Sequence, residues 1–351
     1  MPGLSLKQGD RAACAAARNG RKADACVRKN RIIREKNRIS ILRSFKTIEK
    51  GRDMNVFIQT LIVGLRLGSI YALIALGYTM VYGIIKLINF AHGDFIMVGG
   101  YTIIFTAPVM TSLGLPAWLA VLPAIVICVL VGMGTELVAY RPVRRNGTKM
   151  TALITAIAMS LFLENLAQAI PAIGPNPKVA SQIFPSGGIE IGSVTLGWTT
   201  ILTLIVSALI MFVLYEFTQK TKLGRAMRCV SEDKEAATLM GINVNRTILM
   251  TFAIGSGLAA VAALMYIAQY PQATTTMGST LGLKAFIAAV LGGIGILPGA
   301  MLGGIVIGLV ESFTTTYISS SLSDAFVFLI LIAVLLLKPV GLLGKNVGEK
   351  V

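Results

Sequence analysis

The sequence predicts an all-α integral membrane protein with about eight transmembrane helices (range eight to ten), some of them broken. Of its 351 residues, 55% are hydrophobic and 14% are charged, whereas a soluble protein carries about 25% charged residues. Several apolar runs approach or exceed the ~20 residues that cross a bilayer. The lipid bilayer is therefore the first predicted partner.

The first 53 residues differ from the rest in composition. They hold 15 Lys/Arg and 5 Asp/Glu and lack the apolar core of a signal peptide. Such charge suits a nucleic-acid arm or a lipid anchor, but Phe45 is the only aromatic side chain there. We expect a disordered appendage, or upstream sequence translated before a natural start at Met54. Residues 54–351 then form the transmembrane domain, and nucleic acid is not a predicted partner.

Apolar runs follow one another from Val56 onward, separated by short polar or Gly/Pro-rich connections. The first run, Val56–Ile85, contains Arg66 and is long enough for one tilted helix or two short ones. Leu283–Ile294 is too short for a comfortable crossing. The other predicted spans are Phe95–Leu113, Ala117–Tyr140, Thr151–Ile170, Thr199–Phe217, Thr247–Ala268, Ala300–Tyr317 and Asp324–Leu337.

The charges in the connections predict the side of the membrane that each one faces. By the positive-inside rule, the Lys/Arg residues of loop 141–149 and the lysines of residues 338–350 are cytoplasmic. Pro171–Trp198 and the uncharged Gln269–Gly282 are predicted to be external. A single helix over Val56–Ile85 would export the basic tail. Either that run contains two crossings or the tail is not native.

The longest charged stretch, Lys220–Arg246, cannot lie in hydrocarbon and must be a loop or surface helix at the membrane face. Within it, Glu235 begins a short predicted helix that Gly241 closes. Ala236, Ala237 and Met240 give this helix a small, shallow face that suits docking into the groove of another protein. A solvated linker helix is the alternative interpretation.

A polar island interrupts the apolar pattern at Asn89, His92 and Asp94. Unwound backbone at membrane depth is tolerated only where it lines a cavity or is buried in protein, and an intramembrane ionisable residue is a functional candidate. The island therefore predicts part of a translocation pathway. A short interfacial turn, anchored by Lys86, is the alternative.

A second helix break is expected at Gly292–Gly299, and Gly299 with Gly303 forms a small-xxx-small pair for close helix packing. Paired interruptions in the early and late parts of a chain point to a transporter built from repeats, with its pathway at the membrane midplane. The residues predicted to make the break and its packing are Gly292, Gly293, Gly295, Pro298, Gly299 and Gly303.

No side chains are grouped for catalysis, metal binding or nucleotide binding. The four cysteines (Cys14, Cys26, Cys128 and Cys229) lack metal or redox spacing, and His92 is the only histidine. No G-x-x-x-x-G-K-[ST] motif occurs. We therefore expect no enzyme activity, metal or cofactor in this chain, and any ATP that powers transport must bind to a partner.

Four stretches within residues 54–351 carry a resemblance to a known family. They are GSIYALIALGYTMVYGIIKLINFAHGDFIMVGGY from Gly68, AYRPVRR from Ala139, GRAMRCVSEDKEAATLMGIN from Gly224 and LKAFIAAVLGGIGILPGAMLGGIVIGL from Leu283. Together they resemble the permease subunits of ABC importers for branched-chain amino acids, most closely the LivH type. The resemblance implies import of leucine, isoleucine or valine across the bacterial inner membrane.

The same resemblance implies a complex with a second permease subunit, two cytoplasmic ATPase subunits and a periplasmic amino-acid-binding protein. Glu235, Ala236, Ala237 and Gly241 match the EAA-x-x-x-G loop with which importer permeases engage their ATPases. The downstream Ile-x-Leu-Pro of some importers is missing, which puts the docking geometry of this loop in question.

Three other functions fit parts of the sequence. A urea or short-amide permease would belong to a family similar to this one. A secondary transporter would need coupling carboxylates within its spans, for which Glu136, Glu164, Glu216 and Glu311 are candidates. A structural membrane scaffold would leave the helix breaks and the docking helix unexplained.

The composition of the tail leads to a prediction. Deleting residues 1–53, so that translation starts at Met54, should leave membrane insertion and transport intact, because this segment buries too little apolar surface to fold. Membrane fractionation and uptake assays of the shortened chain test this. Loss of insertion would contradict it.

Overall fold

The computed structural model describes residues 54–344 except 88, 186, 192, 193 and 339, so the predicted tail lies outside the described residues. Within this part of the chain, eight helices are long and apolar enough to cross a membrane, which confirms the predicted class. The elements are the first helix Met54–Ile85, α3 His92–Ser112, η1 Ala117–Ala120, α4 Val121–Thr135, the π-helical turn η2 Glu136–Tyr140, α5 Arg141–Asn146, α6 Lys149–Ala169, β1 Lys178–Val179, β2 Gly188–Ile191, β3 Val194–Gly197, α7 Trp198–Lys220, α8 Lys222–Glu232, α9 Lys234–Leu239, α10 Val244–Gln269, β4 Gln272–Ala273, α11 Met277–Gly292, α12 Leu297–Tyr317, η3 Ser320–Leu322 and α13 Ser323–Leu337.

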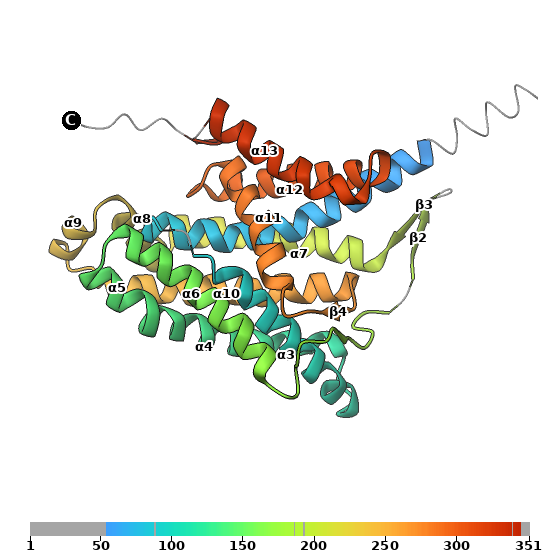
Figure 1. Cartoon of the computed structure of the whole chain (residues 1–351), viewed down its shortest axis with the longest axis horizontal. Coiled ribbons are helices and arrows are strands. Elements are labelled where there is room, and N and C mark those ends of the chain that lie inside the picture. The colour runs from blue at the N-terminus through green and yellow to red at the C-terminus, as the bar shows by residue number, and fades with distance from the viewer. Residues whose placement is uncertain (1–53, 88, 186, 192–193, 339, 345–351) are drawn as a thin grey trace, which may run out of the picture. The chain divides into compact units, whose positions relative to one another are not determined.

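The two ends of the helix bundle differ in character. Strands β2, β3 and β4 gather at one end, and α5, α8 and α9 gather at the other (Figure 1). Strands β1 and β4 pair with each other in antiparallel register, which joins the two connections predicted to be external. The connections predicted to be external therefore lie together at one end of the bundle, and the charged connections lie at the other.

The first helix runs without interruption from Met54 to Ile85, so the alternative of two crossings in this run is wrong. Its early part lies at the end of the bundle that carries the strands. There Thr60 shares a hydrogen bond of 3.3 Å with Thr316, and Arg66 donates one of 3.2 Å to Thr200 at the start of α7. One crossing therefore separates residue 60 from the end that carries α8 and α9.

Both helix breaks overlap their predicted ranges, but their bounds differ by a few residues. The first helix ends at Ile85 and α3 begins at His92, so His92 and Asp94 belong to the first turn of α3. Helix α12 begins at Leu297, so Pro298 and Gly299 lie in its first turn. Proline is tolerated there because the first N–H groups of a helix have no partner within it.

The connection Gln269–Gly282 is shorter than predicted, because α11 begins at Met277. Residues 277–282 are helical although Thr280 and two glycines lower their apolar character. Gly278 and Gly282 fit closely against α3: a Cβ at Gly278 would lie 2.8 Å from the carbonyl oxygen of Gly93. Tertiary packing therefore extends the helix beyond its apolar part.

The first helix, α3, α10 and α11 supply most of the buried core. Helices α4, α6, α7 and α13 expose long rows of Leu, Ile, Val and Phe. Such rows suit contact with lipid, because hydrocarbon tails are as apolar as these side chains.

Helix α12 packs through glycine on two sides. A Cβ at Gly303 would lie 2.0 Å from the carbonyl oxygen of Ala288 on α11. On the other side, a Cβ at Gly308 would lie 2.1 Å from the backbone nitrogen of Gly68 on the first helix. The three helices therefore approach one another at backbone distance.

The closest of these contacts can be tested with one added methyl group. A Cβ at Gly292 would lie 1.9 Å from the carbonyl oxygen of Gly299, so Gly292→Ala must push α11 and α12 apart. We expect a loss of about 1–3 kcal/mol of stability, the usual cost of overpacking. Thermal unfolding of the purified protein in detergent measures this loss.

Gly134→Ala is the matched control, since nothing lies within 4 Å of a Cβ at that position on α4. It should be neutral or slightly stabilising, because alanine favours the helix more than glycine does. Equal stability of the two variants would contradict the predicted clash.

Candidate functional site

The predicted docking helix is α9, and both of its ends are closed by local hydrogen bonds. The Asp233 carboxylate accepts from the backbone N–H groups of Glu235 at 2.8 Å and Ala236 at 3.1 Å. At the other end, Gly241 has a φ of +81°, and the N–H of Ile242 donates to the carbonyl of Ala237 at 3.0 Å. This Schellman-type ending explains why glycine occupies position 241.

The exposed face of α9 agrees only in part with the one that we expected from the sequence. Ala237 is only 3% exposed and packs inside its own chain with Met227, Val230 and Ile248, so it does not face a partner. Met240 is 82% exposed and Ala236 is exposed, as predicted, and Leu239 and Glu235 are exposed beside them, Leu239 at 88%. The outer surface of the helix is therefore apolar at its end.

Cations surround the inner side of α9. Burial lowers the pKa of Lys234, and the positive charges of Arg144 and Lys86 lower it further. Arg144 in turn pairs with the buried carboxylate of Glu136 at 2.9 Å and donates to Asn245 at 2.9 Å. The two contacts of Arg144 fix the start of α10 and the turn η2 to α5.

The polar island is enclosed by protein. Asn89, His92 and Asp94 are all buried, and the amide oxygen of Asn89 accepts a hydrogen bond of 2.7 Å from the Tyr140 hydroxyl. The His92 ring packs edge-on against Tyr78, with ring centroids 4.6 Å apart.

Several polar atoms of the island lack a hydrogen bond of good geometry within the described residues. They include both ring nitrogens of His92, both carboxylate oxygens of Asp94 and the amide nitrogen of Asn89. Ser160 and Glu164 on α6 are polar neighbours of Asp94. An unsatisfied buried polar group costs about 1–3 kcal/mol, so the island suits a guest that can form hydrogen bonds, such as water or a polar solute.

The second break is covered by the segment that follows α13. Gly293 has a φ of +103°, which turns the chain away from α11. The N–H groups of Leu342 and Leu343 donate to the carbonyls of Leu291 at 2.8 Å and Gly292 at 3.2 Å. The last carbonyls of α11 are thereby satisfied from a distant part of the sequence.

One cavity of about 520 Å³ adjoins both breaks and the charged loop. Gly83 and Lys86 line it from the first break, and residues 294–297 line it from the second. Helix α8 contributes Met227, Arg228, Ser231 and Glu232. The three segments that the sequence singles out separately therefore meet at one cavity.

The sequence analysis did not identify a second polar cluster, made by Tyr71, Lys284, Glu311 and Asp324 from four different helices. Glu311 was considered there only as a possible coupling carboxylate. Lys284 is a single cation in an apolar segment, and this was a signal available in the sequence.

Comparisons with known proteins agree on the family. The profile described as "Branched-chain amino acid transport system / permease component" matches residues 60–335. The high-affinity branched-chain amino acid transport system permease protein BraD of Pseudomonas aeruginosa is 42% identical over 308 residues, which cover 84% of this chain and 98% of BraD. LivH of Escherichia coli strain K12, also described as a high-affinity branched-chain amino acid transport system permease protein, gives the same identity and coverage.

Among solved structures, PsaBC from Streptococcus pneumoniae in complex with Fab covers 80% of this chain and 90% of that chain at 17% identity, with a TM-score of 0.35. That value supports no comparison of folds. The family profile matches most of the chain, and the two relatives align over 98% of their own length. These comparisons decide the family. The chain is a multi-pass membrane protein and belongs to the family of permease components of branched-chain amino acid transport systems.

Proposed function

We propose that this chain is the membrane-spanning permease of an ABC importer that translocates leucine, isoleucine and valine, driven by ATP hydrolysed on partner subunits. Family membership and the described function of BraD and LivH support this substrate class. One observation carries the mechanism: the charged loop and both helix breaks adjoin the same cavity.

The proposed coupling begins at α9. Leu239 and Met240 present exposed apolar side chains at the end of a capped helix. We propose that this end of the bundle faces the cytoplasm. A partner that buries these side chains would hold α9 firmly. Because α8 directly precedes α9 and lines the cavity, movement of the partner would change the cavity and the two breaks beside it.

The complex that we propose contains a second permease subunit, two cytoplasmic ATPase subunits and a periplasmic amino-acid-binding protein, assembled on the bacterial inner membrane. The lack of a nucleotide-binding motif in the sequence supports an ATPase on another chain, and we propose that this chain binds no cofactor itself. The exposed end of α9 supports a docked partner.

The pathway that we propose passes the island of Asn89, His92 and Asp94. A free amino acid is a zwitterion, so its route needs polar groups without a large net charge. The atoms of the island that lack a hydrogen bond of good geometry supply such groups between α3, α6 and the first helix.

The proposed function is tested by uptake in reconstituted membranes that contain the partner subunits and the binding protein. Labelled leucine, isoleucine and valine should accumulate only when ATP is present. Uptake of urea or a short amide in their place would assign the chain to the alternative substrate class. ATP-independent uptake would support a secondary transporter.

The coupling role predicts the effect of a charge on the exposed end of α9. Leu239→Asp should leave the permease inserted but weaken ATPase binding by about tenfold or more, because it buries a charge without a partner in the docking surface. Co-purification and substrate-stimulated ATP hydrolysis measure this effect.

Cys229→Asp is the matched control, since Cys229 is exposed on the neighbouring α8 but lies outside α9. It should bind the ATPases as the unmodified chain does. If Leu239→Asp also retains normal binding and hydrolysis, the coupling role of α9 is refuted.

The pathway role predicts a separate effect for the island. Asp94→Asn keeps the size of the side chain but removes its charge, so we expect lower leucine uptake while the ATPase subunits still co-purify. Asn89→Leu should act in the same direction. Loss of the complex in both variants would show that the island serves assembly rather than translocation.

A further inference from the structure

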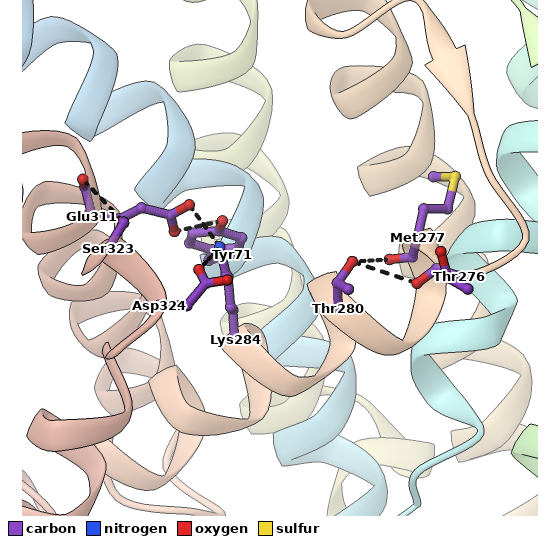
Figure 2. Close-up of polar contacts among 8 residues, drawn as sticks. All are labelled: Tyr71, Thr276, Met277, Thr280, Lys284, Glu311, Ser323 and Asp324. Carbon is purple, nitrogen blue, oxygen red and sulfur yellow. Dashed lines mark hydrogen bonds and ion pairs between the residues drawn. The ribbon is translucent and has the colours of Figure 1, made fainter. Parts of the chain in front are cut away.

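The face of α11 that continues from its N-cap Thr276 exposes several polar side chains, which we call the α11 stripe (Thr276, Ser279, Thr280 and Lys284), and Leu283 is exposed among them. The first three are exposed and Lys284 is partly exposed. The opposite face of α11 is buried, with Gly278, Leu281 and Gly282 among its residues. Figure 2 shows Thr276, Thr280 and Lys284 along this helix, beside the cluster that the sequence did not reveal.

The stripe is unlike the lipid-facing surfaces of the same protein. On α13, the exposed side chains include Leu329, Ile332 and Leu336. A helix that exposes hydroxyl and ammonium groups at membrane depth faces water or protein, because hydrocarbon offers these groups no hydrogen bonds. The stripe therefore faces either an aqueous route or another chain.

The charges at the end of the stripe are only partly satisfied. Lys284 Nζ lies 2.7 Å from Glu311 Oε1 and 2.8 Å from Asp324 Oδ1 (Figure 2). The Tyr71 hydroxyl donates to Glu311 Oε2 at 2.7 Å, so both oxygens of Glu311 are engaged. An ammonium group has three N–H donors, and Lys284 therefore retains one.

Asp324 offers the complementary acceptor. Its side chain is 63% exposed, and only Oδ1 takes part in the ion pair with Lys284. A free donor on Lys284 and a free carboxylate oxygen on Asp324 thus lie next to each other. This pair matches the two ends of an α-amino acid headgroup, since its carboxylate accepts hydrogen bonds and its ammonium group donates them.

The hydroxyl groups add acceptors along the approach to this pair. Ser279 Oγ donates to the carbonyl of Thr276 at 2.9 Å, and Thr280 Oγ1 donates to the carbonyl of Met277 at 3.1 Å. Their donors are used on nearby backbone carbonyls, so their oxygens keep lone pairs that can accept a hydrogen bond from an ammonium group. The headgroup alone is recognised here, which fits a carrier of several apolar amino acids.

We propose that the α11 stripe lines the translocation route and that Lys284 and Asp324 bind the headgroup of the passing amino acid. This inference rests on the proposed function, because it deepens the assignment of an amino acid as substrate. It adds a set of substrate-contacting residues on the opposite side of α11 from the island.

The first experiment measures access of water to the stripe. Thr280→Cys is made in a chain whose Cys14, Cys26 and Cys229 are replaced by serine, and the assembled complex is treated with a cationic, membrane-impermeant methanethiosulfonate reagent. We expect labelling that leucine and its binding protein slow severalfold. The control is Leu329→Cys, an exposed position on the apolar face of α13, which should not react.

The second experiment measures transport. Asp324→Asn should lower leucine uptake by about tenfold or more, the usual weight of a hydrogen bond to a charged group. Hydrolysis of ATP stimulated by the binding protein should persist. Glu190→Gln makes the same chemical change at an exposed carboxylate of strand β2 and should transport normally.

The outcomes separate this inference from the proposed function. A Thr280→Cys variant that reacts no better than Leu329→Cys, labelling that leucine does not slow, or full uptake by Asp324→Asn each overturns the inference. Loss of both uptake and ATP hydrolysis in Asp324→Asn assigns a structural role and overturns it as well. Failure of the unmodified complex to import leucine refutes the proposed function itself.

Discussion

Contact between glycine-bearing helices is the constraint on which the rest of this structure depends. Helix α12 touches α11 at Gly303 and the first helix at Gly308, in both cases at distances where a Cβ has no room. Within a membrane the association of helices gains little from the hydrophobic effect, because lipid is as apolar as the side chains. Close backbone approach supplies dispersion contacts instead. The first helix and α11 are thereby held at fixed positions, and both helix breaks lie at their ends.

Helix α11 connects the candidate functional regions of the chain. Its buried face meets the start of α3, where a Cβ at Gly278 would lie 3.0 Å from the Asp94 carboxylate. Its exposed face carries Lys284, and its last residue, Gly292, is followed by the break that lines the cavity beside α8. A helix this short and this closely packed cannot bend without losing contacts along its whole length. Displacement of one end therefore alters the island and the charged cluster together.

Hydropathy and glycine spacing predicted the class of the fold, the number of spans and the two helix breaks. These features follow from local rules, because span length and glycine conformation depend on the residues themselves. The inward position of Ala237 depends on the packing of α9 against α10, and no periodicity in six residues reveals it. The N–H of Leu342 donates to the end of α11, and Lys284 forms an ion pair with Asp324. Both contacts join segments about 40 residues or more apart in sequence, and the entropy of loop closure alone does not determine which distant segments meet.

The break after α11 is the point where movement can enter this packed arrangement. Gly293 and Gly295 both have positive φ values, +103° and +96°, in a segment of four residues between two helices. Hinges are short segments of this kind that absorb backbone rotation while the attached helices stay rigid. The same segment borders the cavity that α8 lines, and its preceding carbonyls are bound by the segment after α13. A shift of α8 driven from outside would thus act on the hinge first. Through α11 it would then reach Asp94 on one side and Lys284 on the other, without requiring any contact between a partner and the amino acid.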